Sequence, residues 1–155
     1  MSAAKSLAAS SAREEVLQLP MALRAAYLSM HRATNELLRP VGITADQYVC
    51  LLILKQHGTL IQNEIVKQAN SDPNTVKAML QLLEQRALVI REVDPSDRRA
   101  RKVSITDKGL EAVNAASKRL GGIHDQATQC LTAEEAQQMR EYLQRYAAVM
   151  AIPVT

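Results

Sequence analysis

Basic side chains are concentrated in one short stretch of the chain, from Asp97 to Lys102. Besides Asp97 it holds the cations Arg98, Arg99, Arg101 and Lys102, so its formal charge is +3, equal to the net charge of all 155 residues. Guanidinium and ammonium groups at this density suit phosphate oxygens, and a basic loop can reach the backbone or minor groove of a duplex. We interpret this stretch as a nucleic-acid contact; a solvated loop is the alternative.

A second set of side chains with recognition chemistry lies between residues 73 and 86, where Asp72 as a cap and Pro73 at the first position predict a helix. Val76, Leu80 and Leu83 share its inner side. The outer side is polar and nearly free of acids, and it carries Asn74, Thr75, Lys77, Ala78 and Gln81. Amides suit adenine, a threonine methyl suits thymine, and lysine suits guanine or phosphate. Ordinary exposed surface is the alternative.

The segments around these residues predict the elements that must position them. Helices are expected from a start between Ser11 and Pro20 to Leu38, from a capping box at Thr44 and Gln47 to Gly58, and over 62–69. Residues 88–93 and 102–105 are short and β-branched, and the turn signal Asp94–Pro95 predicts a hairpin between them. Thr106 caps the next helix, weakened at Gly121 and Gly122, and Thr132 with Glu135 begins the last.

This order predicts a mainly α fold with a small β-hairpin, a winged helix-turn-helix flanked by long helices from both ends of the chain. We expect a disordered tail over 1–12 and one domain over 13–155, with the winged lobe at 44–106. Apolar stripes on the flanking helices, 13–40 and 107–151, exceed what one small domain buries, and the commonest partner for such stripes is a second copy. The sequence therefore predicts a homodimer.

Composition excludes several other classes of protein. There is no Phe or Trp and only four Tyr, which disfavours reading of single strands by base stacking. The longest apolar run, Tyr48 to Leu54, is far too short to span a bilayer, and the first residues lack the apolar stretch of a signal peptide. Two separated cysteines give neither a disulfide framework nor a zinc site. We expect a cytoplasmic protein without a membrane partner.

Three segments resemble the MarR family of bacterial transcriptional regulators. The most specific is DPSDRRARKVSITDKG at 94–109; GITADQYVCLLIL at 42–54 and NTVKAMLQLLEQRALVIR at 74–91 also match. The resemblance implies a dimer held by the terminal helices that binds a pseudo-palindromic operator, usually as a repressor released by a small ligand or oxidation. It implies that Arg99 enters the minor groove and that Asp97 orients it. Asn74, Thr75 and Lys77 match exposed positions of the family's recognition helix.

The chain departs from the family pattern at four positions. Ala78 and Leu82 stand where the family often has Arg, Ala87 stands where it often has Gly, and Ile61 replaces the usual Ser or Thr cap. We expect fewer DNA contacts from the helix over 73–86, which matches the family's recognition helix. The basic stretch from Asp97 to Lys102, in the family's wing, should make a larger share of them.

The family often binds small aromatic or phenolic ligands between its dimer helices and its DNA-binding lobe. Arg24, Tyr27 and His31 share one side of the first helix at three- and four-residue spacings, and Tyr48 on the next helix can face them. These four residues form our candidate effector pocket; core packing and snorkelling are the alternative interpretation.

Thiol, metal and catalytic chemistry find less support. Cys50 lies in an apolar run, where a free cysteine ordinarily serves as a small buried apolar side chain. Cys130 lies beside a helix start, which can lower the pKa of a thiol, so redox sensing by Cys130 stays an alternative. The histidines lack metal-ligand spacing, and no nucleophile motif or phosphate loop is present. We expect no metal, no cofactor and no enzyme activity. A winged-helix module that binds a protein instead of DNA, or a thiol-based redox regulator, is the alternative function.

Overall fold

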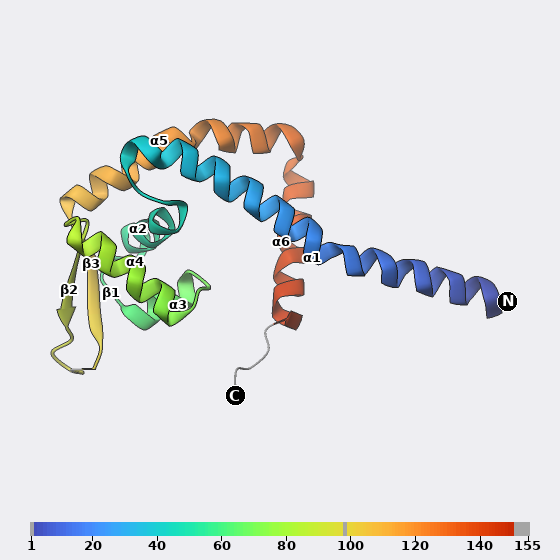
Figure 1. Ribbon diagram of the computed structural model, residues 1–155, viewed down its shortest axis with the longest axis horizontal. Coiled ribbons are helices and arrows are strands. Elements are labelled where there is room, and N and C mark those ends of the chain that lie inside the picture. The colour runs from blue at the N-terminus through green and yellow to red at the C-terminus, as the bar shows by residue number, and fades with distance from the viewer. Residues whose placement is uncertain (1, 98, 151–155) are drawn as a thin grey trace. The chain divides into compact units, whose positions relative to one another are not determined.

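The computed structural model describes residues 2–97 and 99–150, which form two compact units divided at Ala116. Arg98 of the predicted basic stretch and residue 151 of the predicted last helix lie outside the described residues. The elements, shown in Figure 1, are α1 (Ser2–Leu38), the short 3-10 helix η1 (Arg39–Val41), α2 (Ala45–His57), β1 (Leu60–Ile61), α3 (Gln62–Gln68), α4 (Pro73–Gln85), β2 (Val89–Val93), β3 (Arg101–Ile105), α5 (Asp107–Cys130) and α6 (Ala133–Met150).

The first helix is longer than the sequence predicted. It begins at Ser2, so the residues expected as a disordered tail over 1–12 are helical from Ser2 onward, and Pro20 lies inside the helix. Residues 2–12 contain five alanines and no glycine or proline. Alanine has the highest helix propensity, so these residues favour a helix even though bulky apolar side chains are few among them.

Three of the predicted helix starts, at Thr44, Thr106 and Thr132, are confirmed by their capping bonds. The Gln47 amide donates to Thr44 Oγ1 at 3.2 Å, and the Thr44 amide donates to Gln47 Oε1 at 3.1 Å. Thr106 Oγ1 accepts from the Gly109 amide at 3.0 Å, and Thr132 and Glu135 make the same reciprocal pair as Thr44 and Gln47. These bonds satisfy amides that the first helical turn leaves without partners.

Helix α3 begins without a Ser or Thr at its N-cap position. Ile61 has no side-chain acceptor, but its own amide donates to Glu64 Oε2 at 2.9 Å. Half of a capping box is therefore retained.

The predicted hairpin is part of a three-stranded antiparallel sheet in the order β1-β3-β2. Leu60 pairs with Val103, and Val89 pairs with Ile105. Leu60 and Ile61 form the short strand β1, which belongs to this sheet. The wing, defined here as residues 89–105, is thus attached through β1 directly to the start of α3 (Figure 1).

The core of the first unit forms where α2, α3, α4 and the sheet meet. Its largest fully buried side chains include Leu51, Leu54, Ile65, Leu80, Leu83, Val89 and Val103. Helix α2 contributes the fully buried side chains of Cys50, Leu51 and Leu54. Gly109 of α5 is buried against the Leu88 carbonyl, where an added Cβ would lie 2.2 Å from the oxygen.

Among the described residues, no single helix is both long enough and apolar enough to cross a membrane. Residues 14–41 and α2 reach that length and composition only together, as a pair bent by 75°, and α2 contributes to the core.

Candidate nucleic-acid interface

Helix α4 presents its polar side as predicted. Asp72 Oδ1 accepts from the amides of Asn74 and Thr75 at 3.0 and 2.9 Å. Hydrogen bonding from the Thr75 side chain, together with these two amides, lowers the pKa of the Asp72 carboxyl below its usual value. Val76, Leu80 and Leu83 are fully buried. The outward residues are all exposed: Asn74, Thr75, Lys77, Ala78 and Gln81. The predicted division of α4 into inner and outer sides is confirmed.

The loop of the wing is held by the carboxylate of Asp94. It accepts from the Ser96 hydroxyl at 2.6 Å and the Ser96 amide at 2.8 Å, and Lys102 Nζ lies 3.3 Å away. Hydrogen bonds from Ser96, helped by Lys102, lower the pKa of Asp94 to about 2. The Asp94 carboxylate therefore stays ionised and holds the loop that carries the basic residues.

Asp97 shapes the backbone at the tip of the wing. Its Oδ1 accepts from the Arg99 amide at 2.9 Å, and its carbonyl accepts from the Ala100 amide at 2.9 Å. The sequence suggested that Asp97 orients the guanidinium of Arg99; the contact in the structure is to the backbone of Arg99 instead. The Arg99 side chain is exposed.

Arg91 on β2 is a site residue that sequence reasoning missed. Its Nη1 lies 3.3 Å from Glu84 Oε2 of α4, and its Nη2 donates to Gln62 Oε1 of α3 at 3.2 Å. The side chain is only 12% exposed, and its buried Nε has no hydrogen-bond partner among the described residues. Arg91 thus connects the wing to both helices, through partners that no local sequence pattern pairs with it.

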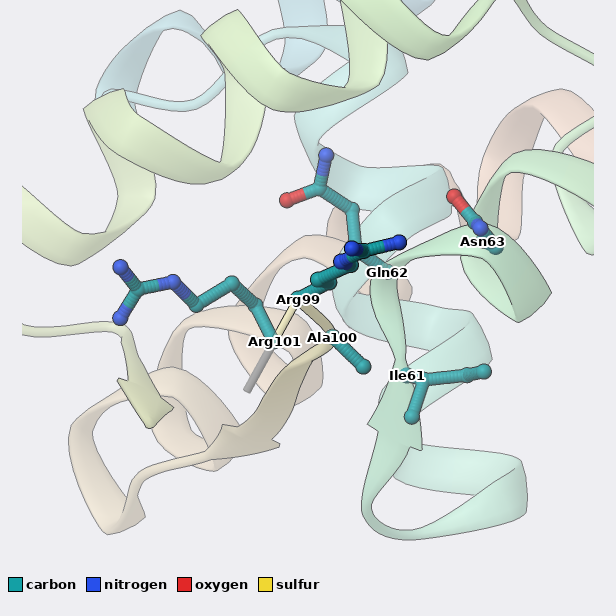
Figure 2. A pocket seen from close by; sticks show the side chains of 6 residues that line it. All are labelled: Ile61, Gln62, Asn63, Arg99, Ala100 and Arg101. Atoms are coloured by element: carbon teal, nitrogen blue, oxygen red, sulfur yellow. The ribbon is translucent and has the colours of Figure 1, made fainter. Parts of the chain in front are cut away.

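The wing and the two helices together line two pockets. One of about 100 Å³ lies between β1, the start of α3 and the wing; Figure 2 shows its lining residues Ile61, Gln62, Asn63, Arg99, Ala100 and Arg101. In this view Arg101 extends in the direction opposite to Ile61 and Asn63. The other, of about 530 Å³, is lined by Gln62, Lys77, Gln81, Glu84, Arg91, Arg99 and Arg101.

The larger pocket brings predicted residues of both elements together. Lys77 and Gln81 of α4 share it with Arg99 and Arg101 of the wing, whereas Asn74, Thr75 and Ala78 do not line it. Four cations and one carboxylate surround this opening, so it favours anions. We call the exposed residues of α4 and the wing the wing–α4 surface.

The candidate effector residues are partly brought together. The rings of Tyr27 and His31 lie 5.4 Å apart, and His31 Nε2 lies 3.3 Å from Asp46 Oδ2 of α2. Arg24 is exposed on α1, and Tyr48 is half-buried on α2. Neither of the two pockets described above is lined by these four residues.

The two thiols differ in environment. Cys50 is fully buried, and burial together with the nearby Asp46 charge raises the pKa of its thiol to about 11. Cys130 is exposed. In the described part of the chain, no three His, Cys, Asp or Glu side chains gather closely enough to hold a metal ion.

Helices α3 and α4 joined by a tight turn, with a three-stranded sheet bearing a basic loop, define a winged helix-turn-helix protein. Residues 43–100 match the model of the MarR family. The winged helix-turn-helix part of the chain is therefore similar to the MarR family.

Known proteins similar to the chain are regulators of transcription. It is 31% identical over 99 residues to the transcriptional repressor MdtR of Bacillus subtilis, an alignment that covers 64% of each chain. The chain thus spans just under two thirds of that relative's length. A mutant of the Escherichia coli MarR protein in complex with operator DNA superposes with a TM-score of 0.78 at 26% identity, over 85% of this chain and 95% of that one. The repressor CouR bound to a DNA duplex superposes with a TM-score of 0.70 at 30% identity, over 86% of this chain and 92% of that one.

Proposed function

We propose that the protein is a homodimeric, sequence-specific regulator of transcription that binds double-stranded operator DNA. The observation that carries this proposal is the shared opening at which Lys77 and Gln81 of α4 meet Arg99 and Arg101 of the wing. Relatives solved in complex with DNA support it. The chemistry is binding rather than catalysis, and we expect neither a cofactor nor an enzyme activity.

The two parts of the wing–α4 surface suit different grooves. In a helix-turn-helix the second helix enters the major groove, here with its exposed residues Asn74, Thr75, Lys77, Ala78 and Gln81 toward the DNA. The wing then lies toward the adjacent minor groove, where its cations Arg98, Arg99, Arg101 and Lys102 suit phosphates and Asp97 holds the backbone of Arg99. Arg99 is the residue that we expect to enter the groove, because Asp97 fixes its backbone and leaves its side chain exposed.

Dimer formation has support in the apolar side chains that each unit leaves exposed. On α1 they include Val16, Leu17, Leu19 and Met21; on α6 they include Met139, Tyr142 and Leu143. A second copy is the partner that covers such faces in symmetric oligomers. A dimer would present two α4 helices about 34 Å apart, one turn of DNA, to a pseudo-palindromic site.

We further propose repression that a small aromatic or phenolic ligand relieves. The paired rings of Tyr27 and His31 beside Asp46, with Arg24 on the same helix and Tyr48 on α2, offer stacking and hydrogen-bonding groups for such a ligand. A redox mechanism through Cys50 is disfavoured, since the raised pKa of this buried thiol leaves little thiolate. The cytoplasm, where the operator lies, is the expected site of action.

The proposal is tested by duplex binding of the full chain to DNA from upstream of its own gene, titrated with salt. Arg99→Ala should weaken binding and, if Arg99 contacts a phosphate, lower the slope of log K against log[salt] by about 1. Arg32→Ala is the control, because it removes the same charge from an exposed position on α1 outside both pockets. Equal affinity and slope for wild type and Arg99→Ala would remove the wing from the mechanism.

One observation favours a second candidate, a winged-helix module that binds a protein. Leu82 on α4 is 49% exposed, an apolar side chain on the flank of α4 that faces away from the wing. Such a module predicts a dimer without salt-dependent duplex binding, and Leu82→Ala would then weaken binding of the protein partner.

A further inference from the structure

The outermost line of α4 carries no charge. Asn74, Ala78, Gln81 and Gln85 follow one another at steps of four, three and four residues, all are exposed, and they lie opposite the buried Val76, Leu80 and Leu83. One flank of this line carries Thr75 and Leu82. The other flank carries Lys77 and Glu84, which line the larger pocket beside the wing.

We propose that α4 reads a short run of A·T base pairs in each half of the operator. This inference rests on the proposed DNA-binding function and specifies its target. The amides of Asn and Gln donate to and accept from the N6 and N7 edge of adenine, and the methyl groups of Ala and Thr contact the C5-methyl of thymine. The outermost line contains only these two kinds of group.

The side chains that would read G·C pairs are absent from the line or engaged elsewhere. Guanine is read chiefly by Arg or Lys and cytosine by Glu or Asp. Lys77 faces the wing, where it shares the larger pocket with Arg99 and Arg101 and suits a phosphate. Glu84 is the exposed acid of α4, and its Oε2 lies 3.3 Å from Arg91 Nη1. Its carboxylate is therefore engaged with Arg91 instead of being available to cytosine.

The length of the run follows from helix geometry. Seven residues separate Asn74 from Gln81, which corresponds to about 10 Å along the helix axis. Successive base pairs are about 3.4 Å apart, so this span covers roughly three steps. We expect Asn74 and Gln81 at adenines near the two ends of the run and the Ala78 methyl at a thymine between them.

Selection of tight-binding duplexes from a randomised library by the full-length protein tests the proposal. Each half of the enriched sequence should contain a run of about four A·T pairs. Gln81→Ala should relax the preference at one end of the run and cost about tenfold or more in affinity for the selected site. Lys77→Ala is the matched control: it should weaken all duplexes alike and lower the salt slope without changing the selected sequence.

A second measurement isolates the methyl contact. Deoxyuridine in place of the central thymine removes only its methyl group, and it should weaken binding by about fourfold. Ala78→Ser places a hydroxyl at this contact and should make the protein less sensitive to the exchange. Thermal melting of each variant shows that a changed selection comes from altered contacts and not from unfolding.

G·C pairs throughout the enriched run, or a selected sequence that Gln81→Ala leaves unchanged, would overturn the inference while leaving DNA binding intact. Absence of salt-dependent binding to any duplex would instead overturn the proposed function, and with it this reading of α4.

Discussion

Replacement of Gly109 by alanine should be one of the most damaging single-methyl changes in the chain. The added Cβ would lie 2.2 Å from the Leu88 carbonyl oxygen and 2.7 Å from Ile105 Cγ1, whereas ordinary contacts are 3.4–4 Å. The Leu88 oxygen cannot withdraw freely, because it accepts from the Thr106 amide at 3.1 Å. The start of α5 must therefore move more than 1 Å away from the wing.

The size of the effect follows from opposing contributions. Overpacking costs about 1–3 kcal/mol and a weakened hydrogen bond about 1 kcal/mol, while alanine in place of glycine in a helix returns about 1 kcal/mol. We expect a net loss of about 2 kcal/mol in the free energy of unfolding. For a chain of this length the Tm should fall by about 4–8 °C.

Gly122→Ala is the matched control, because it makes the same change in the same helix with nothing within 4 Å of the added Cβ. It should raise stability by up to about 1 kcal/mol. Both variants are compared by urea and thermal unfolding at one protein concentration, since association shifts Tm. If Gly109→Ala proves as stable as Gly122→Ala, the close contact between α5 and Leu88 is wrong.

Two further predictions concern ionisation. The lowered pKa of Asp94 means that its contribution to stability is present above about pH 4 and is lost as the pH falls toward 2; a carboxyl titration followed by NMR should give a midpoint near 2, rising toward 4 in Ser96→Ala. A wild-type midpoint near 4 would contradict the bonds from Ser96. In a Cys130→Ser variant, the raised pKa of buried Cys50 should prevent reaction with a thiol reagent at pH 8 until denaturant is added, and prompt labelling of the native protein would show that Cys50 is accessible.

Features that depend on neighbours in the sequence could be predicted from it. Thr44, Asp72, Thr106 and Thr132 each bond to an amide two or three residues ahead, so residue type and spacing were sufficient to locate four helix starts. The division of α4 into buried and exposed sides followed from its periodicity in the same way.

Features that depend on distant partners were missed. The pairing of Leu60 with Val103 joins residues 43 positions apart, and a two-residue strand has no periodicity of its own. Arg91 reaches Gln62 across 29 positions, so its role in connecting the wing to α3 and α4 had no local signal. The direction of the Asp97 bond was also beyond sequence reasoning, because the spacing fits a contact to either the backbone or the side chain of Arg99.

The short strand β1 connects the wing to helix α3 through the backbone. Ile61 pairs with Lys102 in the sheet, and the next residue along the chain, Gln62, begins α3. A force on the wing is therefore transmitted through backbone hydrogen bonds to the helix that precedes α4, without passing through a flexible connection. We expect slowly exchanging amides of β3 and α3 to open together in native-state hydrogen exchange, as one cooperative unit.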